Sequence, residues 1–535
     1  MHQKFSKEVT KITTNLKNLS KYEDEMWLCA RCGDCSLADK TVASNRDVYL
    51  PCAIKNVLGF EAFAARGRIM IMNDLLNERI PLSNDIVDWA HTCTTCKSCM
   101  ETCTATADGI NLPDMIEALR RDLVQNEFVM PKHQVIEDSI NELGNPYKEP
   151  SGKRLELFGN RVWPETAPVI YYVGCTSSYR EQEIARTTVE LFDKLGIDYT
   201  VLPEEQCCGS VLLRLGRTKS FERITKMNLE QMKAAGAQTI VTACAGCYRT
   251  WKVDVPNEGY KYDFELLHVT EFLDRMVGEG KVSFESPKPL KVTYHDPCHL
   301  GRHAEVYEAP RRVIESVENV TLVEMETNKR YAHCCGSGGG VKGSFGNLAN
   351  DVAGNRIREA EETEVDVLVT ACPFCHKGLV DGAKHIDSEL PVVDLPEFLL
   401  PFVRKGRKRI MAENPLKKKF MTYLTAHPKI FEGLKKGATI DYDLEGDRFH
   451  VFVTGKSQID VNPVRAENPD VELIFAPKAV EKLITFDSED EYAARFGLFF
   501  KEPTDDEWIK FVLRLNIVKL LMKGYRKFAQ KAGLI

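Results

Sequence analysis

The sequence predicts a multidomain fold in which a helical part, an α/β part made of two similar copies and a small α+β part follow one another. Two observations predict this order. Closely spaced cysteines fill residues 29–103, and a different cysteine pattern occurs twice between residues 175 and 375, after which no cysteine follows. A chain of 535 residues has room for about three or four domains. We expect domains at residues 1–145, 160–400 and 420–535.

The composition is that of a folded protein with one unusual number, its 18 cysteines. A net charge of -7 argues against nucleic acid as a ligand, because phosphate binding needs clustered Lys and Arg. The longest apolar stretch, residues 389–403, contains three acidic residues and is too short to cross a bilayer. The N-terminus lacks the apolar core of a secretory signal. We expect a cytoplasmic chain without a membrane span, which meets the inner face of a membrane only through a partner.

Two cysteine triplets in the N-terminal part have the spacing of metal ligands. The first is Cys29-Ala-Arg-Cys32-Gly-Asp-Cys35, which Cys52 follows. The second is a C-x2-C-x2-C-x3-C run formed by Cys93, Cys96, Cys99 and Cys103. Intracellular thiols stay reduced and are free to bind metal. Bacterial ferredoxins hold cubane clusters with a run of the second kind, although Thr104 stands here where proline is usual.

The triplets predict two cubane 4Fe-4S clusters rather than zinc, because zinc sites are typically built from two CxxC pairs. In two-cluster ferredoxins the last cysteine of a run binds the other cluster. We therefore assign the first cluster to Cys29, Cys32, Cys35 and Cys103, and the second to Cys93, Cys96, Cys99 and Cys52. Cys52 departs most from the pattern, since sixteen residues separate it from Cys35.

The segments beside the triplets predict helices. Residues 60–76 and 112–123 carry apolar residues at helical spacing, which favours an all-α ferredoxin-type domain. The triplets and the stretch Arg66-Gly67-Arg68-Ile69 resemble the iron-sulfur subunits of glycolate oxidase, lactate utilisation proteins and membrane glycerol-3-phosphate dehydrogenase.

The other ten cysteines form an internal repeat. The first copy contains Cys175, Cys207-Cys208-Gly209 and Cys244-x2-Cys247, and the second contains Cys298, Cys334-Cys335-Gly336 and Cys372-x2-Cys375. Offsets of 123, 127 and 128 residues between matching positions indicate a duplication. In each copy, β-rich runs precede the cysteines, at 168–173, 199–202 and 239–242, then at 290–294, 320–323 and 365–370. Helical stretches between such runs predict parallel βαβ units, with the cysteines at the carboxyl ends of the strands.

Adjacent cysteines suit an extended cluster that needs sulfur on two sides. The glycines that follow, Gly209 and Gly336 to Gly340, are expected to let backbone N–H groups approach inorganic sulfide. The alternative, a phosphate-binding loop at 336–340, lacks the following Lys-Ser/Thr pair.

The spacing C-x31-CC-x35-C-x2-C and its second copy resemble the tandem CCG domain of the catalytic subunit of heterodisulfide reductase. Three short motifs support the resemblance: Val173-Gly-Cys-Thr, His295-Asp-Pro-Cys-His-Leu-Gly-Arg302 and Ala332-His-Cys-Cys-Gly. With the N-terminal triplets, the chain is similar to the D-type subunit over about residues 20–400. The resemblance implies two non-cubane 4Fe-4S clusters, with a disulfide cleaved between them. One cluster would be held by Cys175, Cys207, Cys208, Cys244 and Cys247, and the other by Cys298, Cys334, Cys335, Cys372 and Cys375.

Several polar side chains flank the second copy. His295, His299, His303 and His333 are candidate proton donors or substrate contacts, and each could equally form only hydrogen bonds around the metal. Arg302, Arg311 and Lys342 could bind an anionic substrate, and the alternative for each is a solvated surface position.

The C-terminal part carries no cysteine. Residues 401–420 hold eight Lys and Arg against one acid, which indicates a seam between domains, or else a patch for an acidic partner or lipid headgroup. Beyond it the sequence predicts a helix at 421–424, strands at 446–454 and 471–475, a helix at 478–484 and a long amphipathic helical end at 508–532. This α+β domain is faintly similar to the sterol carrier protein fold, and the alternative is a docking domain whose apolar stripe is core.

The sequence predicts an oxidoreductase of the heterodisulfide reductase type, which reduces a disulfide or comparable thiol-linked small molecule. The alternative is an electron relay between a flavoprotein, such as an electron-transfer flavoprotein or a dehydrogenase, and a quinone or membrane cytochrome. The chain contains no Rossmann glycine fingerprint or flavin motif. We therefore expect electrons to come from another polypeptide: a flavoprotein, a ferredoxin or a cytochrome, with a membrane-bound partner among the candidates.

Overall fold

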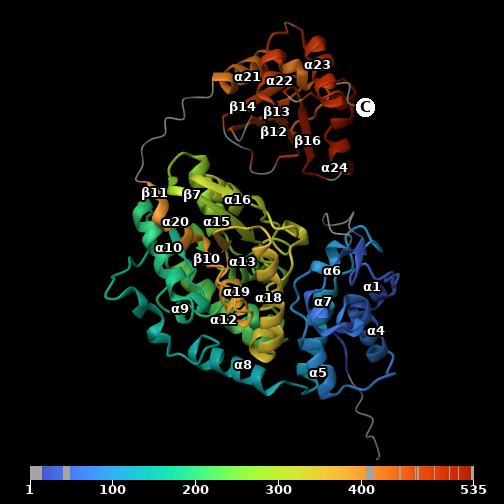
Figure 1. Cartoon of the computed structure of the whole chain (residues 1–535), viewed down its shortest axis with the longest axis vertical. Coiled ribbons are helices and arrows are strands. Elements are labelled where there is room, and N and C mark those ends of the chain that lie inside the picture. The colour runs from blue at the N-terminus through green and yellow to red at the C-terminus, as the bar shows by residue number, and fades with distance from the viewer. Residues whose placement is uncertain are drawn as a thin grey trace, which may run out of the picture. The chain divides into compact units, whose positions relative to one another are not determined.

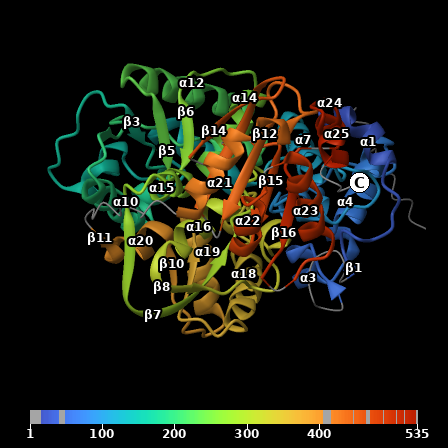
Figure 2. The ribbon, with the colours of Figure 1, turned by 90° about the horizontal axis from the view of Figure 1, so that it is seen from above.

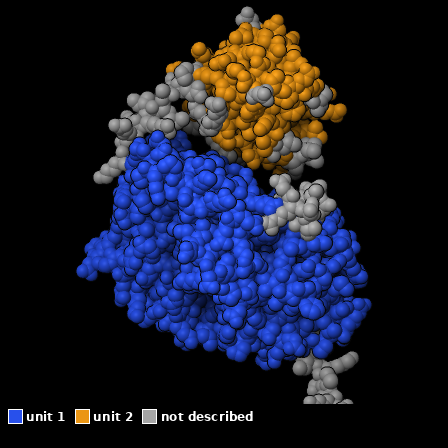
Figure 3. Space-filling view, viewed as in Figure 1, with its two compact units in different colours: residues 1–406 blue, residues 407–535 orange. Residues whose placement is uncertain are grey.

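The computed structural model describes residues 15–39, 48–404, 415–444, 447–463, 466, 469–486, 488–504, 506–515 and 517–531. The chain divides into two compact units, residues 1–406 and 407–535, which Figure 3 distinguishes by colour. In the part of the chain that the structure describes, no helix has both the length and the apolar character that crossing a membrane requires.

The N-terminal part of the first unit is a small bundle of helices, coloured blue in Figure 1. Its elements are η1 (Leu19–Tyr22), α1 (Glu23–Trp27), α3 (Ala53–Leu58), η2 (Glu61–Phe63), α4 (Ala65–Leu76), α5 (Asn84–His91), α6 (Ser98–Glu101) and α7 (Leu112–Gln125). The predicted helix at 112–123 is α7, which begins where the side chain of Asn111 accepts a hydrogen bond from the backbone N–H of Asp114. The predicted helix at 60–76 begins only at Ala65, after the short turn η2.

The bundle differs from the all-α expectation by one short ribbon. Strands β1 (Ala38–Asp39) and β2 (Val48–Tyr49) pair antiparallel. The apolar core consists of side chains from the helices, among them Met72, Met115 and Leu119, none of which is exposed to solvent. Helix α8 (Pro131–Leu143) then leads to the second part and contacts its helices.

The second part contains two four-stranded parallel sheets with the same strand order. In the first copy, β3 (Val169–Tyr171), β4 (Tyr199–Thr200), β5 (Thr239–Thr242) and β6 (Glu265–His268) form the order β4-β3-β5-β6. In the second copy, β7 (Ser283–His295), β8 (Val317–Leu322), β9 (Val367–Thr370) and β10 (Val392–Asp394) form the order β8-β7-β9-β10. β11 (Val403–Arg404) is added antiparallel to β7. The α/β class and the internal repeat are therefore confirmed, and β6 and β10 are strands that the sequence pattern did not reveal.

Helices connect these strands and surround the sheets (Figures 1 and 2). In the first copy they are α9 (Cys175–Tyr179), α10 (Gln182–Leu195), α11 (Ser210–Arg214), α12 (Thr218–Ala234), α13 (Ala245–Arg249), α14 (Val255–Asn257) and α15 (Val269–Gly278), with the 3-10 helix η3 (Ser151–Phe158) before β3 and the π-helical turn η4 (Thr250–Asp254) after α13. In the second copy they are α16 (Glu308–Glu315), η5 (Lys329–Tyr331), α17 (Val341–Ser344), α18 (Gly346–Glu361), α19 (Pro373–His385), α20 (Leu395–Leu399) and η6 (Leu400–Phe402). One continuous apolar core joins both copies.

The second unit is an α+β domain around one mixed sheet. Its strands are β12 (Thr439–Leu444), β13 (Asp447–Gly455), β14 (Gln458–Asn462), β15 (Val471–Phe475) and β16 (Ile509–Leu513), in the order β14-β13-β12-β15-β16. Strands β12 and β15 run parallel, and the other pairs are antiparallel. The helices are α21 (Pro415–Ala426), η7 (Pro428–Phe431), α22 (Pro477–Leu483), α23 (Glu489–Lys501), α24 (Ile517–Met522) and α25 (Tyr525–Lys531).

The prediction of one long helix at 508–532 is wrong. Residues 509–513 (IKFVL) are mostly β-branched or aromatic, and as β16 they pair with β15 along its length. The remainder forms two helices that separate at Gly524, whose φ is +90°. A left-handed glycine ends a helix because other residues adopt that conformation at a cost.

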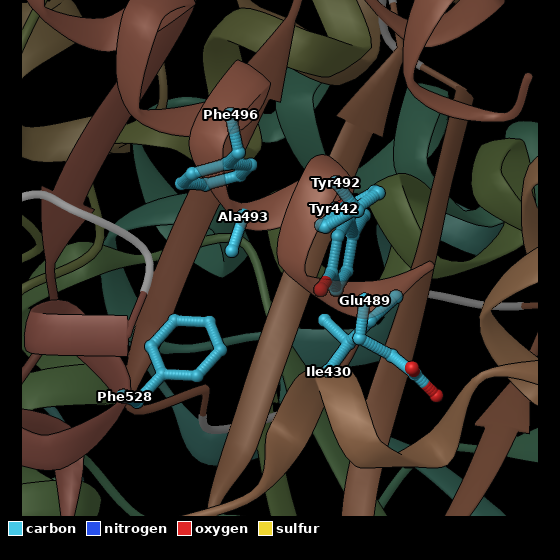
Figure 4. Close-up of a pocket in the computed structure, with 7 residues that line it drawn as sticks. All are labelled: Ile430, Tyr442, Glu489, Tyr492, Ala493, Phe496 and Phe528. Atoms are coloured by element: carbon cyan, nitrogen blue, oxygen red, sulfur yellow. The ribbon is translucent and has the colours of Figure 1, made fainter. Parts of the chain in front are cut away.

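The second unit also contains an apolar slot, shown in Figure 4, lined by Ile430, Tyr442, Glu489, Tyr492, Ala493, Phe496 and Phe528. Its volume of about 10 Å³ is that of roughly one water molecule. An acyl chain does not fit in a slot of that size. The sterol-carrier likeness stays a prediction, which this slot among the described residues does not support.

Candidate metal centre

The first predicted ligand set gathers around one small cavity. The cavity has a volume of about 20 Å³, and its lining includes Cys29, Cys32, Cys35, Cys99 and Cys103. A tight turn brings the first three sulfurs together, because Arg31 and Gly33 have φ values of +58° and +98°. The backbone N–H of Arg66, at the start of α4, donates to Cys35 Sγ at 3.3 Å. Cys32 is exposed, so this group lies at the surface.

The second predicted set also comes together, including Cys52. The pKa of Cys52 is raised to about 12, chiefly by burial, and the nearby thiols of Cys96 and Cys93 contribute to this rise. Burial likewise raises the pKa of Cys99 well above its usual value, and Cys96, Cys35, Cys93 and Cys52 add to this effect. The β1–β2 ribbon lies between Cys35 and Cys52 in the sequence, and Cys52 lies at the start of α3. The sixteen-residue interval thus holds a small folded element.

In the first copy of the repeat, the five cysteines follow three neighbouring strands. Cys175 comes after β3, Cys207 and Cys208 after β4, and Cys244 and Cys247 after β5. Cys175 Sγ lies 3.7 Å from Cys207 Sγ, and Cys208 is hydrogen-bonded to Cys247. The carboxyl ends of parallel strands in an open sheet are the usual place for cofactors.

Buried polar groups fix the loops of the first copy. The carboxylate of Glu205 accepts hydrogen bonds from the backbone N–H groups of Val173, at 3.0 Å, and Gly174, at 2.8 Å, just before Cys175. Arg154 pairs with Glu205 at 3.2 Å, and both side chains are buried. The side chain of Asn228 donates to the carbonyl of Cys207 at 3.3 Å. These contacts hold the loops after β3 and β4 in position for their thiols.

The second copy has the same arrangement. Cys298 follows β7, Cys334 and Cys335 follow β8, and Cys372 and Cys375 follow β9, with Cys335 Sγ 3.4 Å from Cys375 Sγ. His295, at the end of β7, is buried and accepts a hydrogen bond at Nδ1 from Arg356 Nε at 3.2 Å. One ligand atom each from His295, Cys335 and Cys375 lie within 4.8 Å of one another. A metal could therefore be held by this imidazole as well as by the thiols.

The two copies meet through one cysteine from each. The pKa of Cys372 is lowered well below its usual value, chiefly by a hydrogen bond with Cys244 and next by one with Cys375. On either side, the edge strands end in buried titratable groups: His268 is the last residue of β6 and Asp394 is the last residue of β10. Burial lowers the pKa of His268 to about 4 and raises that of Asp394 well above its usual value. The duplicated chain thus forms one site with two similar halves.

The second N-terminal cysteine set is in contact with the second copy. The pKa of Cys96 is lowered, chiefly by a hydrogen bond with Cys334. Cys334 Sγ also donates to Thr94 Oγ1 at 3.6 Å. Arg302 is 2% exposed and spans the junction, because its guanidinium donates to the carbonyl of Cys96 and to that of Ala332, both at 2.6 Å.

The glycine loop at 336–340 serves this same junction. A Cβ on Gly339 would lie 2.4 Å from the carbonyl oxygen of Cys93, and one on Gly338 would lie 3.0 Å from that of Thr94. Arg120 of α7 donates to the carbonyls of Cys93, at 2.7 Å, and Gly339, at 3.0 Å. The close backbone approach that we expected of these glycines is thus to the N-terminal cysteine loop.

The histidines predicted from sequence lie in different surroundings. The Nε2 of His299 contacts Arg249 at 3.1 Å. Its Nδ1 faces Gly246, because a Cβ on that glycine would lie 3.8 Å from Nδ1 and 3.6 Å from Cys244 Sγ. His303 contacts the carbonyl of Thr95 at 2.8 Å. Both ring nitrogens of His333 are engaged, with Glu359 at 3.0 Å and the carbonyl of Leu50 at 3.2 Å. His295 and His299 are therefore the two that lie beside the cysteines of the repeat.

The basic residues predicted near the second copy are held by protein partners. Arg311 is 3% exposed and pairs with Asp296 at 2.7 Å and Glu324 at 2.5 Å. Lys342 pairs with Asp381 at 2.6 Å. The surface alternative is wrong for Arg302 and Arg311, because each side chain is buried and its guanidinium donates to acceptors within the protein.

The donor set fits iron-sulfur clusters. All 18 cysteines are free, and those of the repeat are buried except for the half-buried Cys175 and Cys298. Burying so many thiols together disfavours their ionisation unless a metal compensates the charge, and a coordinated thiol is deprotonated outright. Sequence reasoning did not find Thr94, Arg120 or Glu205, since no local signal distinguishes them from ordinary polar residues of helices and loops.

Known proteins with similar sequences agree with this geometry. The family described as a cysteine-rich domain (CCG) matches residues 169–252 and 292–379. The chain is 36% identical over 389 residues to the D-type subunit of the dihydromethanophenazine:CoB--CoM heterodisulfide reductase of Methanosarcina acetivorans, covering 71% of this chain and 94% of that protein. It is 29% identical over 414 residues to the EtfAB:quinone oxidoreductase of Syntrophomonas wolfei, covering 69% and 57% of the two chains.

Among solved structures, a hypothetical protein from Helicobacter pylori matches with a TM-score of 0.41 and 10% identity, over 63% of this chain and 66% of that one, a likeness too low to carry an argument. The sequence relatives and the cysteine geometry lead to the same conclusion: the chain serves iron-sulfur electron transfer and belongs to the family of D-type heterodisulfide reductase subunits.

Proposed function

We propose that this chain passes electrons through two cubane 4Fe-4S clusters to two non-cubane 4Fe-4S clusters at the CCG motifs, where a heterodisulfide-type substrate is reduced. The observation that carries the proposal is a pair of contacts, Cys96 with Cys334 and Cys244 with Cys372. These contacts join the second N-terminal set to both CCG sets, and Cys99 of the second set lines the same cavity as the first set, so the four cysteine sets lie in one series. Such a series is what an enzyme needs to deliver electrons, one at a time, to a two-electron reaction.

The ligand sets are those that the sequence predicts. The cubanes would be held by Cys29, Cys32, Cys35 and Cys103, and by Cys52, Cys93, Cys96 and Cys99; the CCG clusters would be held by Cys175, Cys207, Cys208, Cys244 and Cys247, and by Cys298, Cys334, Cys335, Cys372 and Cys375. When bound, the clusters supply one-electron redox chemistry and, at the CCG motifs, iron that takes up the sulfur of a thiolate product.

The side chains of the protein would supply the protons and hold the cysteine loops in position. Reducing a disulfide to two thiols takes two electrons and two protons. His299 directs Nδ1 towards Gly246, where the lack of a side chain leaves space beside Cys244, while Arg249 fixes its other nitrogen. His295 lies beside Cys335 and Cys375. We assign these two histidines to proton delivery, His299 beside the cysteines of the first copy and His295 beside those of the second, and His333 to orienting the Cys334 loop through Glu359.

We propose that electrons enter at the first N-terminal cysteine set from an electron-donating subunit. Cys32 is exposed there, and the N-terminal part carries several exposed large apolar side chains: Trp27, Leu28, Leu37, Leu50, Phe60 and Met70. The loop that carries Cys32 is held against η2 and α4, because Ser36 donates to Glu61 at 2.6 Å and Arg66 pairs with Glu61 at 2.9 Å. A surface that combines a ligand loop with exposed apolar residues suits a partner protein.

A second candidate function is an electron relay between a flavoprotein and a quinone or membrane cytochrome. The similarity to a protein named EtfAB:quinone oxidoreductase favours it. In a relay the CCG cysteines would hold clusters but bind no disulfide.

Anaerobic iron and sulfide analysis combined with EPR tests both proposals. Four clusters predict about 16 iron atoms per chain. A paramagnetic signal that appears on oxidation in the presence of a thiol supports disulfide chemistry. About half that iron, or zinc in its place, contradicts the cluster assignment, and the lack of such a signal with every thiol tested favours the relay.

A further inference from the structure

The second unit contains an open basic cleft that the redox site does not explain. The cleft has a volume of about 640 Å³ and is lined by Glu432, Gly433, Leu434, Lys435, Lys436, Gly455, Lys456 and Lys527. All four lysines are exposed. Among the described residues none of these four ammonium groups has an ion-pair partner, whereas Lys478 and Lys482 of the same unit pair with Asp506 and Glu507. Against the four lysines the lining holds one carboxylate, Glu432, so the cleft carries an excess of positive charge.

Two exposed apolar side chains directly precede the turn that packs on the cleft. Leu521 is 50% and Met522 is 68% exposed, at the end of α24. The turn that follows them packs on the cleft, since the backbone N–H of Lys435 donates to the carbonyl of Lys523 at 2.9 Å, and a Cβ on Gly524 would lie 2.1 Å from the carbonyl oxygen of Gly433. The side chain of Lys523 anchors the turn to Asp470 at 2.6 Å. Basic and apolar groups thus form one surface, which we call the α24 surface.

The charge distribution along the chain supports an anionic partner. Residues 407–535 hold 23 Lys and Arg against 19 Asp and Glu, while the complete chain has a net charge of -7. From residue 514 to the end there are six Lys and Arg and no acid. The second unit is therefore attracted to an anionic surface that repels the rest of the chain.

We propose that the α24 surface binds the headgroup layer of an anionic phospholipid bilayer. The lysines would contact lipid phosphates, and Leu521 and Met522 would enter the boundary between headgroups and acyl chains. A soluble phosphate compound would satisfy the lysines but leave these two side chains in water. A basic helix end with apolar residues is typical of segments that lie on a membrane rather than span it.

The test is flotation of the iron-loaded full-length protein with vesicles of phosphatidylcholine alone or of phosphatidylcholine mixed with phosphatidylglycerol. We expect binding to the mixed vesicles only, and its loss at high salt, because screening shortens the reach of exposed charges. Each lysine near an anionic membrane strengthens partitioning about fivefold. The double variant K435Q/K527Q should therefore partition roughly 25-fold more weakly. The variant L521Q/M522Q should also weaken binding.

The matched control is K478Q/K482Q, which removes the same charge from paired lysines of the same unit. We expect it to change partitioning by less than about threefold. Equal losses in the two lysine variants, equal binding to both kinds of vesicle, or no flotation at all would overturn the proposal. Saturable binding of inorganic phosphate without flotation would also overturn it, and would identify the cleft as a site for a soluble anion.

Discussion

At the scale of single residues, the site depends on thiols that share hydrogen bonds in a buried setting. In the pairs Cys244–Cys372 and Cys334–Cys335, the pKa of one thiol is raised and that of the other is lowered by the contact between them. Neighbouring thiols of this kind do not ionise together without a metal, because like charges at short distance in a buried site repel strongly. Metal binding at the repeat is therefore expected to release protons.

Among the predicted cluster ligands, Cys52 departs most from the ferredoxin spacing, and its substitution tests the assignment directly. We expect Cys52→Ala to lower the iron content by about four atoms per chain and to remove one cubane signal, because the second set would lack a fourth thiolate. Iron and sulfide analysis with EPR measures both effects. Asn56→Ala, on the same helix, should retain the full iron content. Unchanged iron in Cys52→Ala would show that another group completes the cluster.

His133 of α8 provides a pH-dependent contribution to stability. Its pKa is lowered from 6.5 to about 3, chiefly by burial, with contributions from the charges of Arg120, Arg217 and Lys132. The unfolded chain takes up the proton first on acidification, so this contribution is present above pH 6.5 and is lost as the pH falls towards 3. The expected loss is about 1.4 kcal/mol per pH unit.

In His133→Gln the melting temperature of the anaerobic protein should fall less between pH 6.5 and about 5 than in the unaltered chain. Glutamine keeps a donor for Ser344, which His133 Nε2 contacts at 2.6 Å. His385→Gln, a half-exposed position on α19, is the control for removing a histidine. Parallel pH profiles for His133→Gln and the unaltered chain would contradict the assignment.

At the scale of elements, the loop before α17 connects the two parts of the first unit. Gly339 has a φ of +63°, and its missing side chain leaves room for the backbone of Cys93 and Thr94. From the sequence we expected these glycines to let backbone N–H groups approach inorganic sulfide. That expectation rests on the same property of glycine, which is that another group can come close to its backbone. In the structure the backbone that comes close to these glycines is that of Cys93 and Thr94 in the N-terminal part.

Gly339→Ala should destabilise the chain by about 2 kcal/mol or more, because alanine is strained at positive φ and its Cβ would overlap Cys93. We expect a full iron content but slower reduction of the CCG clusters by a donor, measured by stopped-flow absorbance. Gly346→Ala is the control, since a Cβ there meets no atom within 4 Å. Equal rates in the two variants would show that the loop does not set the distance between the two cysteine sets.

At the scale of the whole molecule, α7 joins the N-terminal bundle to both copies of the repeat. Arg120 is 0% exposed and donates to the carbonyls of Ala90, Cys93, Arg214 and Gly339. Burial lowers the pKa of its guanidinium to about 10. A single side chain thus ties three segments that lie far apart in the sequence.

Arg120→Leu should lower the free energy of unfolding by at least about 3 kcal/mol, because four buried carbonyls lose their donor. Arg121→Leu is the matched control on the same helix. Arg121 is half-exposed and pairs with Glu258, so its loss should cost about 1 kcal/mol or less. Anaerobic thermal unfolding measures both. A similar cost for the two variants would show that Arg120 does not hold the parts together.

Much of the architecture could be predicted because cysteine spacing and strand patterns are local. The repeat, the parallel units and helix α7 follow from residues that are neighbours in the sequence. Strand β16 could not be predicted from periodicity, since IKFVL lies directly before basic helical residues and is a strand only by pairing with β15. The burial of Arg302 was missed for a similar reason, because its acceptor at Cys96 comes from a segment 206 residues away.

The sequence by itself determined how many cysteine sets exist and which cysteines share a loop, because ligands two or three residues apart must point to one place. Only the tertiary structure decided the order of the sets. Thr94 and Cys334 are 240 residues apart and in contact, and Cys244 meets Cys372 across the two copies. Such contacts depend on how whole elements pack, which no local pattern records. The α24 surface likewise exists only because the turn at Gly524 packs on Gly433.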